Sequence, residues 1–444
     1  MFISQAGLDL LQEALHHLGN GFSQLPPAEA RLDLERLRPV LLEVAERMRD
    51  NYPYHHPLYA GQMLKPPHPL ARLAYALAQF INPNNHALDG GRASSALEKE
   101  AVAEIAVMLG WKEHLGHLTS GGTLANLEAL WIAGCLHPGK RILASSQAHY
   151  THQRICGVLQ IPYDALTVDA AARIDVTALE AELAKGDVGT VVATLGTSSV
   201  GAVDPLHQIL PLAQRYGVRV HVDAAYGGYF RLSEGLNGQA AEAFAAVPGV
   251  DSLAIDPHKH GMQPYGCGCI VFRDPSVGRF YKHDSPYTYF SSHELHLGEI
   301  SLECSRPGAA AVALWATQRL LPLERGGELG QRLDQSLQAA RDLAAWLKAR
   351  PQEWKLLYEP ELDLVVWAPQ GASASQISAR SQEIFERAAE LDLHLAVTQV
   401  SQGSIWPELN WDQPRLACLR SCLMKPEHLE WLPEICRRLE QAAG

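Results

Sequence analysis

An acidic residue and a lysine each follow a short apolar segment in the middle of the chain. Residues 218–222 are rich in β-branched side chains and lead to Asp223, and residues 252–255 lead to Asp256-Pro257-His258-Lys259. Two such strands would bring both side chains to the carboxyl edge of one sheet, where open α/β sheets bind their ligands. A lysine amine forms a Schiff base with an aldehyde, and a carboxylate keeps a pyridine nitrogen protonated so that the ring accepts electrons. The pair therefore indicates pyridoxal phosphate chemistry, although either residue alone is better explained as a strand cap or a surface lysine.

A second feature is a glycine-rich turn that precedes an apolar helix. Ser120-Gly121-Gly122-Thr123 follows a strand-like segment and leads into LANLEALWIAGCL, whose apolar residues recur at helical spacing. Glycine lets the backbone approach an anion, and the first helical turn has unpaired N–H groups and a favourable dipole. This turn is not GxGxxG, and no ribose-binding acid follows at the right distance, so it fits a dinucleotide poorly. Simple helix capping is the alternative, but beside Lys259 the turn indicates a phosphate site.

The elements that must position these residues alternate between strand and helix. Short apolar segments at residues 141–145 and 190–195 precede a helical pattern over 206–216, which leads back to the Asp223 strand. This alternation predicts an α/β fold with a mainly parallel central sheet and helices on both faces. We expect a helical segment over residues 1–60, a large cofactor-binding domain over 61–320 and a small C-terminal α+β domain over 321–444.

Composition excludes several other classes of protein. The 37 basic and 49 acidic residues give a net charge of −12, which argues against a surface for nucleic acid or anionic membranes. No apolar segment has the length of a membrane span. The first residues lack the basic region of a signal peptide and have an amphipathic pattern, so we expect a cytoplasmic protein. The eight cysteines are then expected as free thiols, and Cys267 and Cys269 as one face of a buried strand rather than a metal site.

The sequences HVDAAYGG at 221–228 and DPHK at 256–259 resemble signature blocks of the group II pyridoxal-phosphate-dependent amino-acid decarboxylases. That resemblance covers most of the chain from about His56 onward. It implies the fold type I of pyridoxal-phosphate-dependent transferases and the decarboxylation of an L-amino acid to its amine and CO₂. It also implies a homodimer with the active site at the subunit interface and with residues 1–60 exchanged between subunits.

The resemblance also implies roles for individual residues. His149 would stack on the cofactor ring, with His152 as the less favoured alternative, and Thr197 would lie close to the ring and to Asp223. The cofactor-binding residues expected in this way are Gly121, Gly122, Thr123, His149, Thr197, Asp223, Ala225, Asp256, His258 and Lys259.

Substrate and proton-transfer residues are implied in the same manner. Residues 281–302 lack clean periodicity and match a loop whose tyrosine returns a proton to Cα; Tyr287 and Tyr289 are the candidates, with Tyr287 slightly favoured. The expected substrate-binding residues are Tyr59, Gln62, Asn85, His86, Arg306 and Arg420. Taken singly, these are equally typical of turns, caps or an edge strand.

Two other functions stay open at this point. A carbon–carbon lyase or an aldehyde-forming oxidative decarboxylase would use the same cofactor and lysine and differ in the product. A non-catalytic cofactor-binding protein is disfavoured because Asp223, Lys259 and the glycine turn occur together. The sequence does not identify the side chain of the substrate.

Overall fold

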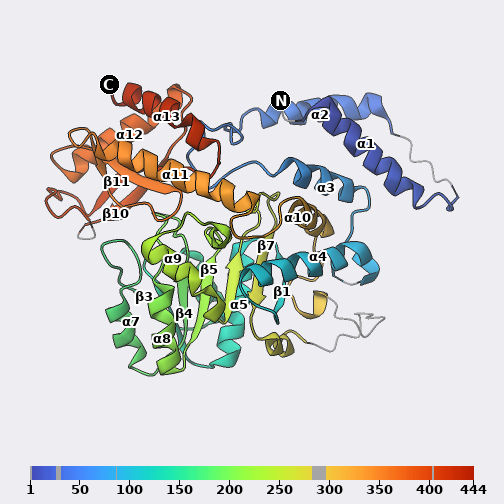
Figure 1. The fold of residues 1–444 in the computed structure, drawn as a ribbon, viewed down its shortest axis with the longest axis horizontal. Helices are drawn as coiled ribbons and strands as arrows, with labels where there is room; N and C mark the ends of the chain where they lie inside the picture. Colours follow the sequence, from blue (N-terminus) through green and yellow to red (C-terminus); the bar gives the residue numbers. More distant parts are fainter. Residues whose placement is uncertain (1–2, 27–31, 87, 283–296, 403–404) are drawn as a thin grey trace.

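The computed structural model describes residues 3–26, 32–86, 88–282, 297–402 and 405–444. The chain folds around two sheets, a large one built from residues 115–272 and a small one built from residues 354–422 (Figure 1). The predicted α/β class, with a smaller C-terminal sheet, is confirmed.

The large sheet has seven strands in the order β1-β7-β6-β5-β4-β2-β3. Only β7 runs antiparallel to its neighbours, so the carboxyl ends of β4, β5 and β6 lie side by side. In the register of these strands Thr194 pairs with Asp223, and Asp223 pairs with Ala254. The strands are β1 (Leu115–Thr119), β2 (Arg141–Ser145), β3 (Tyr163–Leu166), β4 (Val188–Thr194), β5 (Arg219–Ala224), β6 (Ser252–Ile255) and β7 (Gly268–Phe272).

Helices cover both faces of this sheet. Alternate residues of a strand therefore pack in different apolar clusters. Leu253 packs in a cluster with helices α4, α8 and α9, whereas its neighbour Ala254 packs with α5. Strand β5 follows the same alternation: Val222 joins the first cluster, while His221 and Asp223 face α5 and α6. The helices around the sheet are α3 (Pro69–Gln79), α4 (Leu88–Met108), α5 (Gly122–Leu136), α6 (Thr151–Leu159), α7 (Val176–Leu183), α8 (Leu206–Tyr216), α9 (Gly238–Ala245) and α10 (Gly308–Leu320), with short 3-10 helices η1 (Gly228–Leu232), η2 (Val247–Gly249), η3 (Pro275–Phe280) and η4 (Leu297–Glu299).

The small sheet is antiparallel, with the order β10-β11-β9-β8. Its apolar core also contains Leu58 and Ala60, and the backbone of Ala60 donates to His394 O, so the residues just before position 61 pack with the C-terminal unit. The domain boundaries near residues 60 and 320 stay a prediction. The elements are α11 (Glu328–Lys348), β8 (Trp354–Leu356), β9 (Leu364–Pro369), α12 (Ala374–Glu390), β10 (Ala396–Ser401), β11 (Arg415–Cys422) and α13 (His428–Ala443).

The two N-terminal helices, α1 (Gln5–Asn20) and α2 (Leu34–Met48), extend away from the sheets along α3 (Figure 1). Neither contains a buried residue, although both are amphipathic. In the described part of the chain, no helix combines the length and the apolar character that a membrane crossing requires.

Candidate active site

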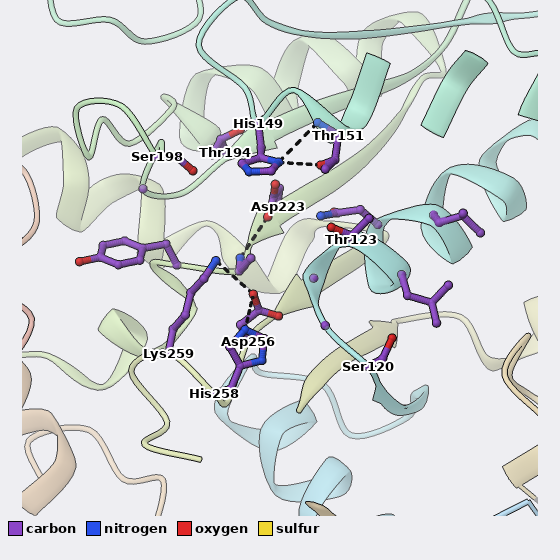
Figure 2. Close-up of a pocket in the computed structure, with 18 of the residues that line it drawn as sticks. Ser120, Thr123, His149, Thr151, Thr194, Ser198, Asp223, Asp256, His258 and Lys259 are labelled. Carbon is purple, nitrogen blue, oxygen red and sulfur yellow. Dashed lines mark hydrogen bonds and ion pairs between the residues drawn. The ribbon is translucent and has the colours of Figure 1, made fainter. Parts of the chain in front are cut away.

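A cavity of about 460 Å³ opens at the carboxyl ends of β4, β5 and β6, beside the first turn of α5 (Figure 2). Both ionisable residues singled out in the sequence, Asp223 and Lys259, line it. The other predicted cofactor residues that line it are Gly121, Gly122, Thr123, His149, Ala225, Asp256 and His258. The topology therefore brings together residues that span more than 130 positions of the chain.

Asp223 lies at the back of the cavity and is only 5% exposed. Its Oδ2 is 2.9 Å from Nε2 of the buried His152, and its Oδ1 accepts from the backbone N–H of Ala225 at 3.1 Å. Burial acts to raise the pKa of Asp223, but the hydrogen bond from His152, the charge of Lys259 and the Ala225 N–H together hold it well below its usual range. The Asp223 carboxyl group is therefore a buried anion that faces the cavity.

Lys259 projects into the cavity from the turn after β6 (Figure 2). Its Nζ lies 3.1 Å from Oδ2 of Asp256, which is also 3.4 Å from Nε2 of His258. The other carboxylate oxygen, Oδ1 of Asp256, is buried and has no hydrogen-bond partner among the described residues. His258 is fixed in turn because its Nδ1 donates to the backbone oxygen of Cys267 at 2.8 Å. Asp256 thus holds the lysine amine at the cavity until an aldehyde is available.

The glycine turn forms one wall of the cavity because the backbones there approach one another closely. A Cβ at Gly122 would lie 2.9 Å from Oδ2 of Asp256, and a Cβ at Gly268 would lie 2.5 Å from the carbonyl carbon of Gly121. No described side chain caps the start of α5; the Leu124 N–H binds Gly121 O at 3.0 Å, which leaves the N–H groups of Gly122 and Thr123 without a partner among the described residues. Such a helix start binds a phosphate group.

His149 enters the cavity from the turn before α6. Its Nδ1 is 2.8 Å from Oγ1 of Thr151, which fixes the plane of the ring (Figure 2). Burial lowers the pKa of His149, with the charge of Asp223 acting in the opposite direction. This shift favours the neutral form of the imidazole, whose flat ring suits stacking on a flat cofactor.

One predicted cofactor residue does not reach the cavity. Thr197 is fully buried, and its Oγ1 accepts from the backbone N–H of Ala202 at 3.0 Å. Thr194, three residues earlier, lines the cavity instead, and its Oγ1 has no hydrogen-bond partner among the described residues. Thr194 ends strand β4, and Gly196 and Ser198, on either side of Thr197, also line the cavity.

The predicted substrate residues fall into two groups. Arg420 is near the cavity: its guanidinium donates to the backbone oxygen of Ser198, a lining residue, and to Oε1 of Gln62 at 2.9 Å. Tyr59 is buried close by, and its hydroxyl oxygen accepts from the backbone N–H of Gln62 at 3.3 Å. These three residues form a polar group at the boundary between the two sheets.

The second group lies below the glycine turn and does not line the cavity. Arg306 forms an ion pair of 2.7 Å with Glu98 and donates to the backbone oxygen of Leu118. Asn85 donates to the same Glu98 at 2.6 Å. His86 is half-buried beside the exposed Cys304, at 3.4 Å from its Sγ. Arg306 and Asn85 thus brace the end of β1, and Tyr287 and Tyr289 lie outside the described residues.

Two supporting residues, on α5 and β5, were not predicted from the sequence. Asn126 lines the cavity one helical turn after Gly122, and its Oδ1 accepts from Nε2 of His221 at 2.8 Å. Burial lowers the pKa of His221 to about 3, so this ring is neutral. The spacing of four residues between Gly122 and Asn126 could have indicated a shared helix face.

The site fits pyridoxal phosphate. That molecule has two charged parts, a pyridinium and a phosphate. An anionic carboxylate that suits the pyridinium and an uncapped helix start that suits the phosphate line the same cavity. The lysine between them supplies the amine for the aldehyde. The arrangement is that of fold type I pyridoxal-phosphate enzymes.

The match to a known family agrees with this fit to pyridoxal phosphate. Residues 54–369 match the model of the pyridoxal-dependent decarboxylase conserved domain. The chain therefore belongs to the pyridoxal-dependent decarboxylase family, whose cofactor is pyridoxal phosphate and whose reaction is the decarboxylation of amino acids.

The chain is also similar to named relatives, and its fold is similar to that of solved structures. The chain is 29% identical to the L-tyrosine decarboxylase of Enterococcus faecium, over 80% of this chain and 76% of the relative. It is 29% identical to the L-aspartate decarboxylase of Thermococcus kodakarensis, over 73% and 83%. The fold is similar to that of mouse CSAD, with a TM-score of 0.80, 19% identity and 99% coverage of both chains. It is also similar to Oryza sativa TDC with PLP and tryptamine, with a TM-score of 0.79, 18% identity and coverage of 96% and 92%.

Close packing of Gly268 against the glycine turn yields a prediction. In Gly268→Ala the new methyl group displaces Gly121, so the helix start no longer fits the phosphate, and the dissociation constant for pyridoxal phosphate should rise by roughly tenfold or more. Equilibrium dialysis of the apoenzyme with the cofactor measures this constant. Gly157→Ala is the control because its Cβ would meet nothing within 4 Å. Equal affinities in both variants would show that the turn does not hold the phosphate.

Proposed function

We propose that this protein removes the α-carboxylate of an L-amino acid as CO₂ and releases the amine, with Lys259 as the residue that bonds the cofactor. The observation that carries this proposal is the placement of Asp223, Lys259 and the start of α5 around one cavity. Each group meets a different part of pyridoxal phosphate: ring nitrogen, aldehyde and phosphate.

Asp223 has the role of holding the ring nitrogen protonated. Its low pKa and its buried position keep a full negative charge where the nitrogen would lie. When bound, the cofactor draws electrons from the bond that breaks at Cα. A charge pair at a buried position is stronger than one in water, so Asp223 favours this electron withdrawal.

His149 and Lys259 control orientation and proton transfer in this scheme. The Thr151 hydroxyl fixes the plane of His149 against one face of the ring. Lys259 pairs with Asp256 in the structure; it would bond the cofactor aldehyde, and as a free amine it would accept or return a proton. Tyr287 and Tyr289 stay predictions for the donor to Cα, with His149 next.

The polar group at the sheet boundary is the candidate for carboxylate recognition. Arg420 is 8% exposed, and its Nε is buried without a hydrogen-bond partner among the described residues. A substrate carboxylate would satisfy this donor. The named activities of the relatives make L-tyrosine and L-aspartate the first substrates to test.

Product analysis tests the proposed reaction. The purified holoenzyme incubated with each of the twenty amino acids should release CO₂ and an equal amount of amine from at least one of them. Mass spectrometry and a CO₂ assay measure the two products. An aldehyde with ammonia or peroxide would instead support oxidative decarboxylation, and an aldehyde with no CO₂ would support a carbon–carbon lyase.

Lys259 is predicted to be the single attachment site of the cofactor. Borohydride reduction followed by peptide mapping should place the pyridoxyl group on Lys259, because its amine is the one that lines the cavity. Lys259→Ala should lose the visible absorbance band and keep its fold, since a side chain at a cavity contributes little to the core. A label on another lysine would refute the assignment.

Asp223→Asn is predicted to bind the cofactor and lose turnover. An amide carries no charge to hold the ring nitrogen protonated, so kcat should fall by roughly 100-fold or more. Steady-state kinetics with the best substrate measure the effect. Asp164→Asn is the matched control because Asp164 is 60% exposed at the edge of the sheet. Wild-type turnover in Asp223→Asn would mean that this acid is only structural.

We further propose a homodimer in which α1 and α2 pack against a second copy. These helices expose apolar side chains such as Leu37 (49%), Leu41 (70%) and Met48 (63%), which a partner subunit would cover. Leu37→Glu combined with Leu41→Glu should convert the dimer to a monomer, as measured by light scattering after size-exclusion chromatography. Arg38→Glu, on the same helix, should stay dimeric. A monomeric wild-type protein would exclude this assembly.

All eight cysteines are free thiols, which a reducing compartment maintains. This supports the proposal of a cytoplasmic location, which cell fractionation tests.

A further inference from the structure

The buried histidine behind Asp223 has no part in the scheme above. His152 is the second residue of α6 and is completely buried, whereas His149 lies three residues earlier and lines the cavity. The 2.9 Å contact between His152 Nε2 and Asp223 Oδ2 therefore comes from behind the site, through the sheet-facing side of α6. His152 contacts the carboxylate without lining the cavity.

The surroundings of His152 determine which protonation state the contact requires. Its Nδ1 is buried and has no hydrogen-bond partner in the described part of the chain. A protonated ring would leave an N–H donor unpaired at that position, at a higher cost than an unpaired nitrogen lone pair. The neutral ring with its proton on Nε2 fits, and it donates to Asp223.

A neutral donor has a specific consequence for the carboxylate. The Ala225 N–H binds Oδ1 at 3.1 Å and the His152 N–H binds Oδ2, so both oxygens are fixed in position. Neither donor carries a net charge that would cancel the anion. The remaining lone pairs of the carboxylate stay available on the cavity side.

We propose that His152 is a positioning residue that acts through Asp223, holding the carboxylate in the orientation that pairs with the cofactor nitrogen while leaving its charge intact. The segment from His149 to His152 then sets two features of the site, since Thr151 fixes the ring of His149 and His152 fixes Asp223. This inference rests on the proposed role of Asp223.

Two substitutions at this position separate hydrogen bonding from packing. His152→Phe keeps an aromatic ring of similar size and removes the donor. His152→Gln restores an N–H group at about the position of Nε2. The matched control is His137→Phe, since His137 caps the opposite end of α5 from the cavity.

The readouts are the dissociation constant for pyridoxal phosphate, measured with apoenzyme by absorbance titration, and the separate values of kcat and KM. A hydrogen bond to a charged group contributes a substantial free energy. His152→Phe should therefore raise the dissociation constant and lower kcat by roughly 10- to 100-fold, with KM little changed. His152→Gln should recover most of the loss, and His137→Phe should match the wild type.

A double-mutant cycle tests whether the effect passes through Asp223. In the Asp223→Asn background, His152→Phe should change the dissociation constant by less than about twofold. Three results would each overturn the proposal. They are wild-type values in His152→Phe, a folded His152→Gln that is as impaired as His152→Phe, and an undiminished effect of His152→Phe in the Asp223→Asn background. Thermal unfolding of every variant identifies a folding defect. If His152→Phe has such a defect, the comparison of His152→Gln with the wild type decides instead. Failure of the wild-type apoenzyme to bind the cofactor would instead refute the proposed function itself.

Discussion

A buried negative charge is the constraint on which this site depends. Burying the Asp223 carboxylate costs free energy, because burial favours its protonated form. Hydrogen bonds from His152 and from the Ala225 backbone, together with the nearby Lys259 charge, outweigh that cost. The resulting anion has no fixed cation of its own at hydrogen-bond distance among the described residues, so a pyridinium is the partner that completes it.

The fold supplies this arrangement through the direction of its strands. Because β4, β5 and β6 are parallel, Thr194, Asp223 and the turn that carries Lys259 emerge at one edge. Helix α5 begins at the same edge and presents its free N–H groups. Close backbone contact between Gly121 and Gly268 fixes the distance between that helix start and the sheet. A single rigid framework would thus hold both ends of one ligand, with the ring nitrogen at Asp223 and the phosphate at the start of α5.

The sequence predicted the parts of the site that depend on local patterns. These are the apolar strands that end at Asp223 and before Lys259, and the glycine turn before a helix, each of which is recognised from a few neighbouring residues. The structure brings all of them to one cavity. The contacts that it did not predict join distant positions. His152 and Asp223 are 71 residues apart, and Asn126 and His221 are 95 apart, so only the folded sheet reveals them. Thr197 and Arg306 were expected from a family resemblance, and in this chain they contact Ala202 and Glu98 instead.

The central claim is that Asp223 keeps the ring nitrogen of the bound cofactor protonated. Nuclear magnetic resonance of the holoenzyme loaded with pyridoxal phosphate labelled with ¹⁵N in the ring reports that protonation directly. The account predicts the chemical shift of a protonated nitrogen over the whole pH range in which the wild-type protein is folded, and of an unprotonated nitrogen in Asp223→Asn. An unprotonated ring nitrogen in the wild-type protein would contradict it.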